Sequence, residues 1–135
     1  MYCLVFAATM RIAVVVNPDA GLGGRFGFNG SDGRAAEARA AGAEDRAGPR
    51  MKLCLEHLAK LSQTPSELLA WEGRRGGDWI PSSYTSTGIT PEITSAEVTA
   101  EFVKSHEPDL FLYAGGDGTT RDIVEALGDR DTPIV

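Results

Sequence analysis

Two short apolar runs place the strongest constraint on the fold of this chain. Residues 12–16 (IAVVV) and 110–114 (LFLYA) have no alternating polar positions, and a strand with that pattern is buried on both faces. Such strands belong to parallel sheets that are covered by helices on both sides. Segments of helical character lie between the two runs. The sequence therefore predicts an α/β fold with a doubly wound, Rossmann-like parallel sheet.

Local patterns predict the remaining elements. Thr94 and Glu97 have the spacing of a capping box, which predicts a helix that starts at Thr94. Residues 79–90 give no clear prediction. The chain is expected to be truncated within its last strand, because no terminal helix or polar tail follows it. Further strands are expected at residues 66–71 and 132–135, the latter buried, and helices at residues 34–47, 50–61, 94–106 and 121–128.

Composition and charge exclude several classes of protein. The chain has a formal net charge of −6, a pI of about 4.8, and no apolar stretch of the roughly 20 residues that a membrane span requires. The acidic balance argues against nucleic acid or an anionic membrane as a partner. Cys3 and Cys54 stand apart from each other and from any histidine cluster, so neither a zinc site nor a disulfide is expected. One cytoplasmic domain, residues 1–135, is the expectation.

The charge is unevenly distributed along the chain. Residues 1–76 hold ten Lys/Arg and eight Asp/Glu, whereas residues 77–135 hold three and eleven. A phosphate site should therefore draw its cations from the first half. Arg25 and Arg34 flank a glycine-rich loop there, and they are either phosphate ligands or solvated surface residues.

The segment Gly115-Gly116-Asp117-Gly118-Thr119 follows the second apolar run directly. Three glycines between a strand and a helix allow successive N–H groups to point into one concavity at the helix N-terminus, which is an anion site. A carboxylate there adds like charge to a phosphate, but it has a role if it holds Mg²⁺ or accepts a proton from an attacking hydroxyl. The alternative is that Asp117 only closes a tight turn.

A second glycine-rich loop follows the first apolar run. Residues 17–24 read NPDAGLGG, which matches neither G-x-x-x-x-G-K-[ST] nor G-x-G-x-x-G. In a doubly wound sheet the loops after the central strands meet where ligands bind. We therefore expect the two glycine loops to face one crevice, although a long surface loop is the other interpretation of residues 17–24.

The pair of motifs resembles the NAD kinase and diacylglycerol kinase superfamily. N-P-x-A-G-x-G-G at residues 17–24 and G-G-D-G-T at residues 115–119 carry the resemblance, which extends over residues 11–135. The sequences GSDG at residues 30–33 and TSAE at residues 94–97 resemble the ATP-NAD kinase-like branch in particular.

The resemblance implies the N-terminal half of a two-domain kinase whose β-rich C-terminal half is missing here. Such an enzyme transfers a phosphoryl group from ATP or polyphosphate, with Mg²⁺, to the 2′-hydroxyl of NAD. Asp117 would then be the catalytic residue, as a base or a metal partner. The metal ligands are unknown, and the second acidic element of the family would lie in the missing half. The nucleotide-binding residues would be Asn17, Pro18, Gly21, Gly23, Gly24, Asp32, Gly33, Gly115, Gly116, Gly118, Thr119 and Thr120.

Two alternatives stay open. A lipid or diacylglycerol-type kinase belongs to the same superfamily, although the sequence shows no basic face for a membrane. A non-catalytic nucleotide-binding or assembly module is the rival from another class. In either case, apolar surface left by a missing half is expected to cause homo-oligomerisation.

Overall fold

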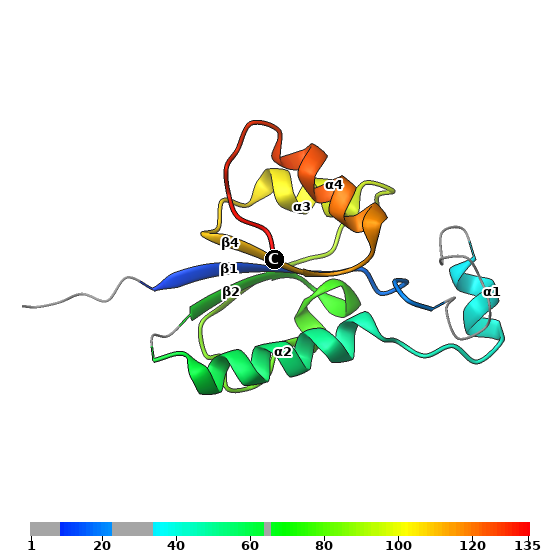
Figure 1. The fold of residues 1–135 in the computed structure, drawn as a ribbon, viewed down its shortest axis with the longest axis horizontal. Coiled ribbons are helices and arrows are strands. Elements are labelled where there is room, and N and C mark those ends of the chain that lie inside the picture. Colours follow the sequence, from blue (N-terminus) through cyan, green and yellow to red (C-terminus); the bar gives the residue numbers. More distant parts are fainter. Residues whose placement is uncertain (1–8, 23–33, 64–65) are drawn as a thin grey trace, which may run out of the picture.

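The computed structural model describes residues 9–22, 34–63 and 66–135. Together they form one four-stranded sheet, all parallel, in the order β3-β2-β1-β4 (Figure 1). The parallel α/β sheet expected from the two apolar runs is therefore confirmed. The strands are β1 (Met10–Val16), β2 (Ser66–Trp71), β3 (Thr87–Thr90) and β4 (Leu110–Ala114).

The strand order contains one reversal. The chain adds β2 and then β3 on one side of β1, and it returns to add β4 on the other side. Ile12 of β1 therefore pairs with Leu68 of β2 and with Leu110 of β4. In open parallel α/β sheets, ligands bind at the carboxyl ends of the strands beside such a reversal. The segments that follow β1 and β4 flank this position.

Helices cover both faces of the sheet. Helix α2 (Ala47–Leu61) lies on one face, and α3 (Val98–Ser105) and α4 (Asp117–Leu127) lie on the other (Figure 1). The short helix α1 (Ala35–Ala40) lies beyond the strands, near the segment that follows β1. No helix within the described ranges is long and apolar enough to cross a membrane.

Strand β1 contributes to two hydrophobic cores. Val14 is buried with Met51 of α2 on one face, and Val15 is buried with Phe102 of α3 on the other. All five residues of the run 12–16 are buried. Because both faces of the strand are covered, neither face needs polar residues, which explains the uninterrupted apolar run.

The first two helices differ from their predicted bounds. Helix α1 ends at Ala40 instead of residue 47, because Gly42 adopts a φ of +97° that a continuing helix does not allow. Helix α2 begins at Ala47 instead of residue 50. Its first turn packs so closely that a Cβ on Gly48 would overlap the indole ring of Trp79. Tertiary packing therefore determines where α2 begins.

The last two helices also begin at other residues than predicted. The capping box at Thr94 is wrong: α3 begins at Val98, and the N–H of Glu97 donates to Ser95 Oγ at 3.0 Å instead. Helix α4 begins at Asp117 instead of residue 121, because the N–H of Thr120 already donates to the Gly116 carbonyl. The predicted stop at Gly128, with a φ of +57°, is confirmed.

Two strand predictions need correction. Strand β3 lies in the stretch that gave no prediction, and it is short and only half covered. The buried strand expected at residues 132–135 is instead a single parallel bridge between Phe111 and Ile134. None of residues 131–135 is buried, because no further strand among the described residues covers their outer edge.

Candidate functional site

A cleft of about 470 Å³ lies at the carboxyl ends of β1 and β4. It confirms that the segments after the two apolar runs face one crevice, as far as residues 20–21 and 113–116 are concerned. The start of α2 forms the third part of its wall. The lining residues are Ala20, Gly21, Arg46, Ala47, Arg50, Tyr113, Ala114, Gly115, Gly116 and Val135.

Asn17 joins the two motifs directly. Its side-chain Nδ2 donates to Thr119 Oγ1 at 3.0 Å, and its backbone N–H donates to the Ala114 carbonyl at 2.9 Å. Its Oδ1 accepts the N–H of Asp19 at 3.1 Å, which fixes the turn after β1. Thr119 is 4% exposed. Asn17 and Thr119 therefore hold the two loops against each other.

Gly115 is required by this arrangement. A Cβ added at Gly115 would lie 2.5 Å from the Cβ of Thr119, closer than the two groups can approach. Gly116 and Gly118 differ, because a Cβ added at either one meets nothing within 4 Å and neither has a positive φ. Neither packing nor backbone conformation among the described residues explains these two glycines. A requirement for the close approach of a ligand would explain them.

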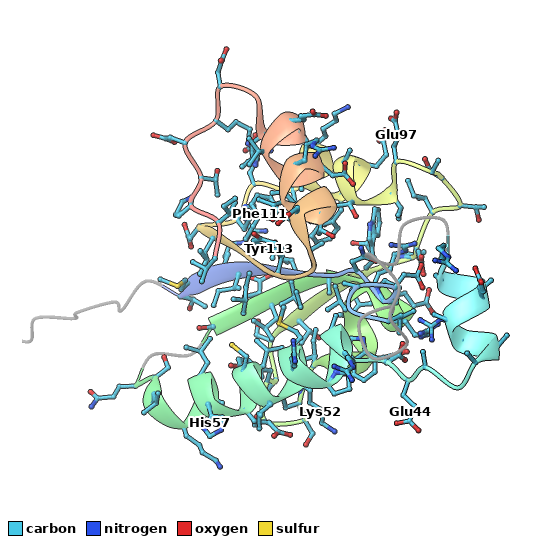
Figure 2. All side chains as sticks on the ribbon, turned by 45° about the vertical axis from the view of Figure 1, so that its right-hand side comes forward. Glu44, Lys52, His57, Glu97, Phe111 and Tyr113 are labelled. Atoms are coloured by element: carbon cyan, nitrogen blue, oxygen red, sulfur yellow. The ribbon has the colours of Figure 1, made fainter. Side chains whose placement is uncertain are left out.

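Thr120 stabilises the turn from the helix side. Its Oγ1 donates to the Gly116 carbonyl at 3.1 Å and lies 2.7 Å from the hydroxyl of Tyr113. Because a hydroxyl has one proton, Tyr113 is the donor to Thr120. Tyr113 lies beside Phe111 where β4 passes below α4 (Figure 2). Both threonine hydroxyls of the motif thus have partners within the protein, and their contact with a nucleotide stays a prediction.

Asp117 is the first residue of α4 and is exposed. Within the described part of the chain its carboxylate has no hydrogen-bond or ion-pair partner, so it is available to a ligand. It follows Gly116, which lines the cleft. The positive end of the helix dipole stabilises a carboxylate at this position.

At this position Mg²⁺ would need ligands from a substrate as well as from the protein. The described residues contain no group of three or more His, Cys, Asp or Glu side chains that could hold a metal ion. Mg²⁺ is often held by one or two carboxylates together with substrate phosphates and waters. Asp117 can supply one such carboxylate, and the phosphates of a nucleotide would supply other ligands.

The sequence analysis missed Arg46 and Arg50. Both line the cleft, are exposed and have no ion-pair partner in the described residues. Arg34, which was the named candidate, instead pairs with Glu37 at 2.9 Å, and this hydrogen bond lowers the pKa of the Glu37 carboxyl. Arg25 lies outside the described residues. The prediction that phosphate-binding cations come from the first half agrees with Arg46 and Arg50.

The other predicted residues of the first loop divide into two groups. Gly21 lines the cleft with a φ of +76°, so glycine is favoured there. Pro18 is buried, and its carbonyl accepts a hydrogen bond from Arg39 Nη2 at 2.9 Å. The remaining candidates lie outside the described residues: Gly23, Gly24, Asp32 and Gly33.

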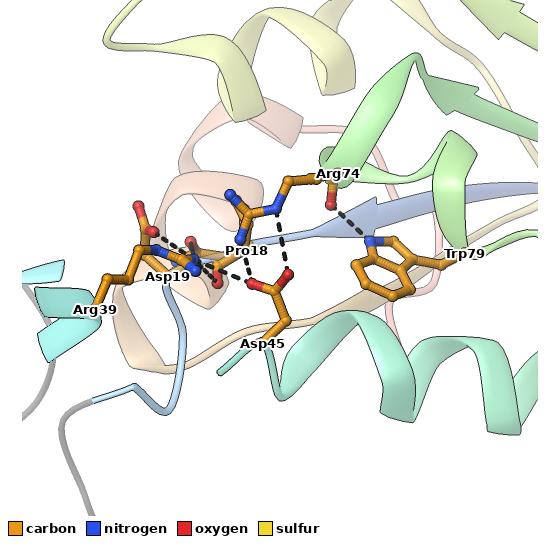
Figure 3. A network of polar contacts seen from close by, with 7 residues as sticks. Pro18, Asp19, Arg39, Asp45, Arg74 and Trp79 are labelled. Atoms are coloured by element: carbon orange, nitrogen blue, oxygen red, sulfur yellow. Dashed lines mark hydrogen bonds and ion pairs between the residues drawn. The ribbon is translucent and has the colours of Figure 1, made fainter. Parts of the chain in front are cut away.

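An ion-pair network joins the loop after β1 to the segment before α2 (Figure 3). Arg39 bridges Asp19 of the loop after β1 and Asp45 of the segment before α2, at 3.1 Å each. Arg74, which follows β2, also pairs with Asp45. Burial would raise the pKa of the Asp45 carboxyl, but the hydrogen bonds from Arg74 and Arg39 outweigh burial and lower it. The network ties together three segments that reach the same edge of the sheet.

Comparison of the chain with protein-family models, with curated proteins and with solved structures finds no match. A function for the cleft therefore has to be inferred from its geometry and from the motifs around it.

Proposed function

We propose that this chain is the nucleotide-binding half of an NAD kinase-like phosphotransferase. One observation supports the proposal: a glycine turn and the loop after β1 line one cleft at the switch point of a parallel sheet, and the unpaired Asp117 directly follows that turn. Open sheets of this kind bind nucleotides at such a point. A cytoplasmic location is part of the same proposal.

The glycine turn supplies the phosphate-binding part of the proposal. The N-terminus of α4 offers unpaired N–H groups and a positive dipole end, which favour phosphate oxygens. Gly116 and Gly118 leave open space above this end, so a phosphate can approach the backbone. Gly115 and Thr119 hold the turn in place from below.

Asp117 is the proton acceptor in the proposed reaction. In the proposed reaction the 2′-hydroxyl of NAD loses its proton to the Asp117 carboxylate while its oxygen attacks the terminal phosphorus of ATP or polyphosphate. The bond from that phosphorus to the bridging oxygen breaks, and the shortened donor leaves with the bonding electrons. Mg²⁺, when bound, neutralises charge on the phosphates. Positioning of the two substrates accounts for the rest of the rate acceleration over the uncatalysed reaction.

An assay of NADP formation tests the proposal. The full-length protein is given NAD and Mg²⁺ with either ATP or polyphosphate, and NADP is quantified. The proposal expects NADP that depends on Mg²⁺ and on one of the two donors. If NAD and ATP bind but no NADP forms with either donor, the protein is a nucleotide-binding module instead.

A further inference from the structure

Arg46 and Arg50 form an unusual pair at the start of α2. Arg46 is the residue before the first turn, and Arg50 follows four positions later. Four residues correspond to about 6 Å along a helix axis and place both side chains on one face. Both line the cleft. The stem of Arg46 also lies beside Gly21, because a Cβ on that glycine would be 3.7 Å from Arg46 Cδ.

This pair is unfavourable for the fold by itself. Like charges four residues apart on a helix repel each other. Cations at a helix N-terminus also oppose the dipole, and the first turn of α2 has no acidic residue to offset them. The stability of α2 therefore gives no reason for two arginines here, whereas an anionic ligand in the cleft would.

Nearby carboxylates do not neutralise the pair. Asp45 immediately precedes Arg46, but it is held by Arg39 and Arg74 (Figure 3). Asp19 is held by Arg39 as well. Most other arginines among the described residues have a carboxylate or carbonyl partner, whereas Arg46 and Arg50 have none. Their positive charges are therefore available to an anionic ligand that enters the cleft.

The other residues that line the cleft indicate what kind of anion fits. Besides the arginines, the cleft is lined by Gly115 and Gly116, which precede α4, and by the apolar surface of Tyr113, Ala114 and Ala20. A ligand that contacts both the arginines and the N–H groups of the glycine turn needs several connected anionic groups. Orthophosphate has a single anionic group and would make fewer of these contacts than a phosphate chain.

We propose that Arg46 and Arg50 form a subsite for a chain of two or more phosphates, as found in a nucleoside diphosphate or triphosphate or in polyphosphate. The binding of a phosphate chain by this subsite does not depend on the proposed function. Only the identification of the phosphate chain as part of a phosphoryl-transfer substrate rests on that function. Guanidinium groups bind phosphate oxygens in pairs, so each arginine contributes directed hydrogen bonds as well as charge.

Titration calorimetry of the chain with inorganic tripolyphosphate tests the subsite. Arg46→Gln and Arg50→Gln should each weaken binding about tenfold or more, since a hydrogen bond to a charged group contributes about 1.5–3 kcal/mol. Arg121→Gln is the matched control, because Arg121 is exposed on α4, has no ion-pair partner in the described ranges and does not line the cleft. It should bind as the wild type does. Orthophosphate should bind more weakly than tripolyphosphate to the wild type.

The subsite is overturned if the wild-type chain does not bind tripolyphosphate, or if the cleft variants bind it as tightly as Arg121→Gln does. Circular dichroism and melting curves identify a variant that fails to fold, and Arg50→Lys, which keeps the charge, should then show intermediate affinity. ATP in place of tripolyphosphate distinguishes a nucleotide from the bare phosphate chain. If the arginines bind tripolyphosphate but the full-length protein forms no NADP, only the proposed function fails. If NADP forms with unchanged KM in both variants, only the subsite fails.

Discussion

The side-chain amide of Asn17 donates a hydrogen bond to the hydroxyl of Thr119 across 102 positions of sequence. One residue follows β1 and the other lies in the first turn of α4, so the bond joins the two motifs that flank the cleft. Thr119 is nearly inaccessible to solvent. A lost partner there cannot be replaced easily by water.

Asn17→Ala should therefore destabilise the fold by about 1–3 kcal/mol, because it leaves the buried Thr119 hydroxyl unpaired and also removes the turn contact to Asp19. Thr119→Val removes the hydroxyl but keeps the shape. In the double variant the second substitution should cost less than it does alone. Urea denaturation of the four proteins measures this coupling, and strictly additive free energies of unfolding would contradict it.

The two glycines of the motif should respond in opposite ways to alanine. Gly115→Ala forces a Cβ against Thr119 and should cost about 1–3 kcal/mol. Gly118→Ala places its methyl in open space within the first turn of α4 and should stabilise the fold by about 0.5–1 kcal/mol. Thermal melting of both variants checks the signs.

ATP binding tests whether Gly118 has a functional role. If Gly118 is kept for the approach of phosphate, the more stable Gly118→Ala protein should bind ATP more weakly than the wild type. Unchanged affinity in that variant would mean that the open space above α4 is not used by the ligand.

The network around Asp45 should make stability depend on pH in the acidic range. Because hydrogen bonds from Arg74 and Arg39 lower the pKa of Asp45 below its ordinary value of 3.8, the carboxylate stabilises the folded state above pH 3.8. This contribution disappears as the pH falls through the lowered pKa. Asp45→Asn should cost up to about 1 kcal/mol at pH 7 and progressively less below pH 4.

Denaturation of wild type and Asp45→Asn between pH 2 and pH 7 gives this difference directly. Glu44→Gln is the control, since the Glu44 side chain lies on the outer surface (Figure 2) and has no ion pair among the described residues. A difference between wild type and Asp45→Asn that stays constant with pH would contradict the role of the network.

The sheet could be predicted because its signal is local. Residues 12–16 and 110–114 are continuous apolar runs, which is the pattern of strands covered by helices. The first run is buried throughout, whereas in the second only Phe111 is buried. Once both are parallel strands, the meeting of their following loops is a consequence of topology. Strand β3 could not be found in this way, because it is short and half exposed.

The start of α2 could not be predicted because packing determines it. The close contact between Gly48 and Trp79 holds the first turn in place, and no periodicity within residues 47–61 reveals that contact. With the start misplaced, Arg46 belonged to the predicted helix at residues 34–47 and Arg50 to the start of the next predicted helix, so their shared face was hidden. The available signal was the spacing of Arg46 and Arg50, four positions apart on either side of Pro49.

The most direct measurement compares Asp117→Asn with Asp122→Asn in the full-length protein. Both residues are exposed on α4, but Asp122 lines a separate cavity between α3 and α4. Asp117→Asn should lower the rate of NADP formation by roughly 10²–10⁴, which is the usual contribution of a positioned acid or base. Nucleotide affinity and melting temperature should change little, and Asp122→Asn should keep the wild-type rate. A rate within a few-fold of wild type for Asp117→Asn would contradict its catalytic role.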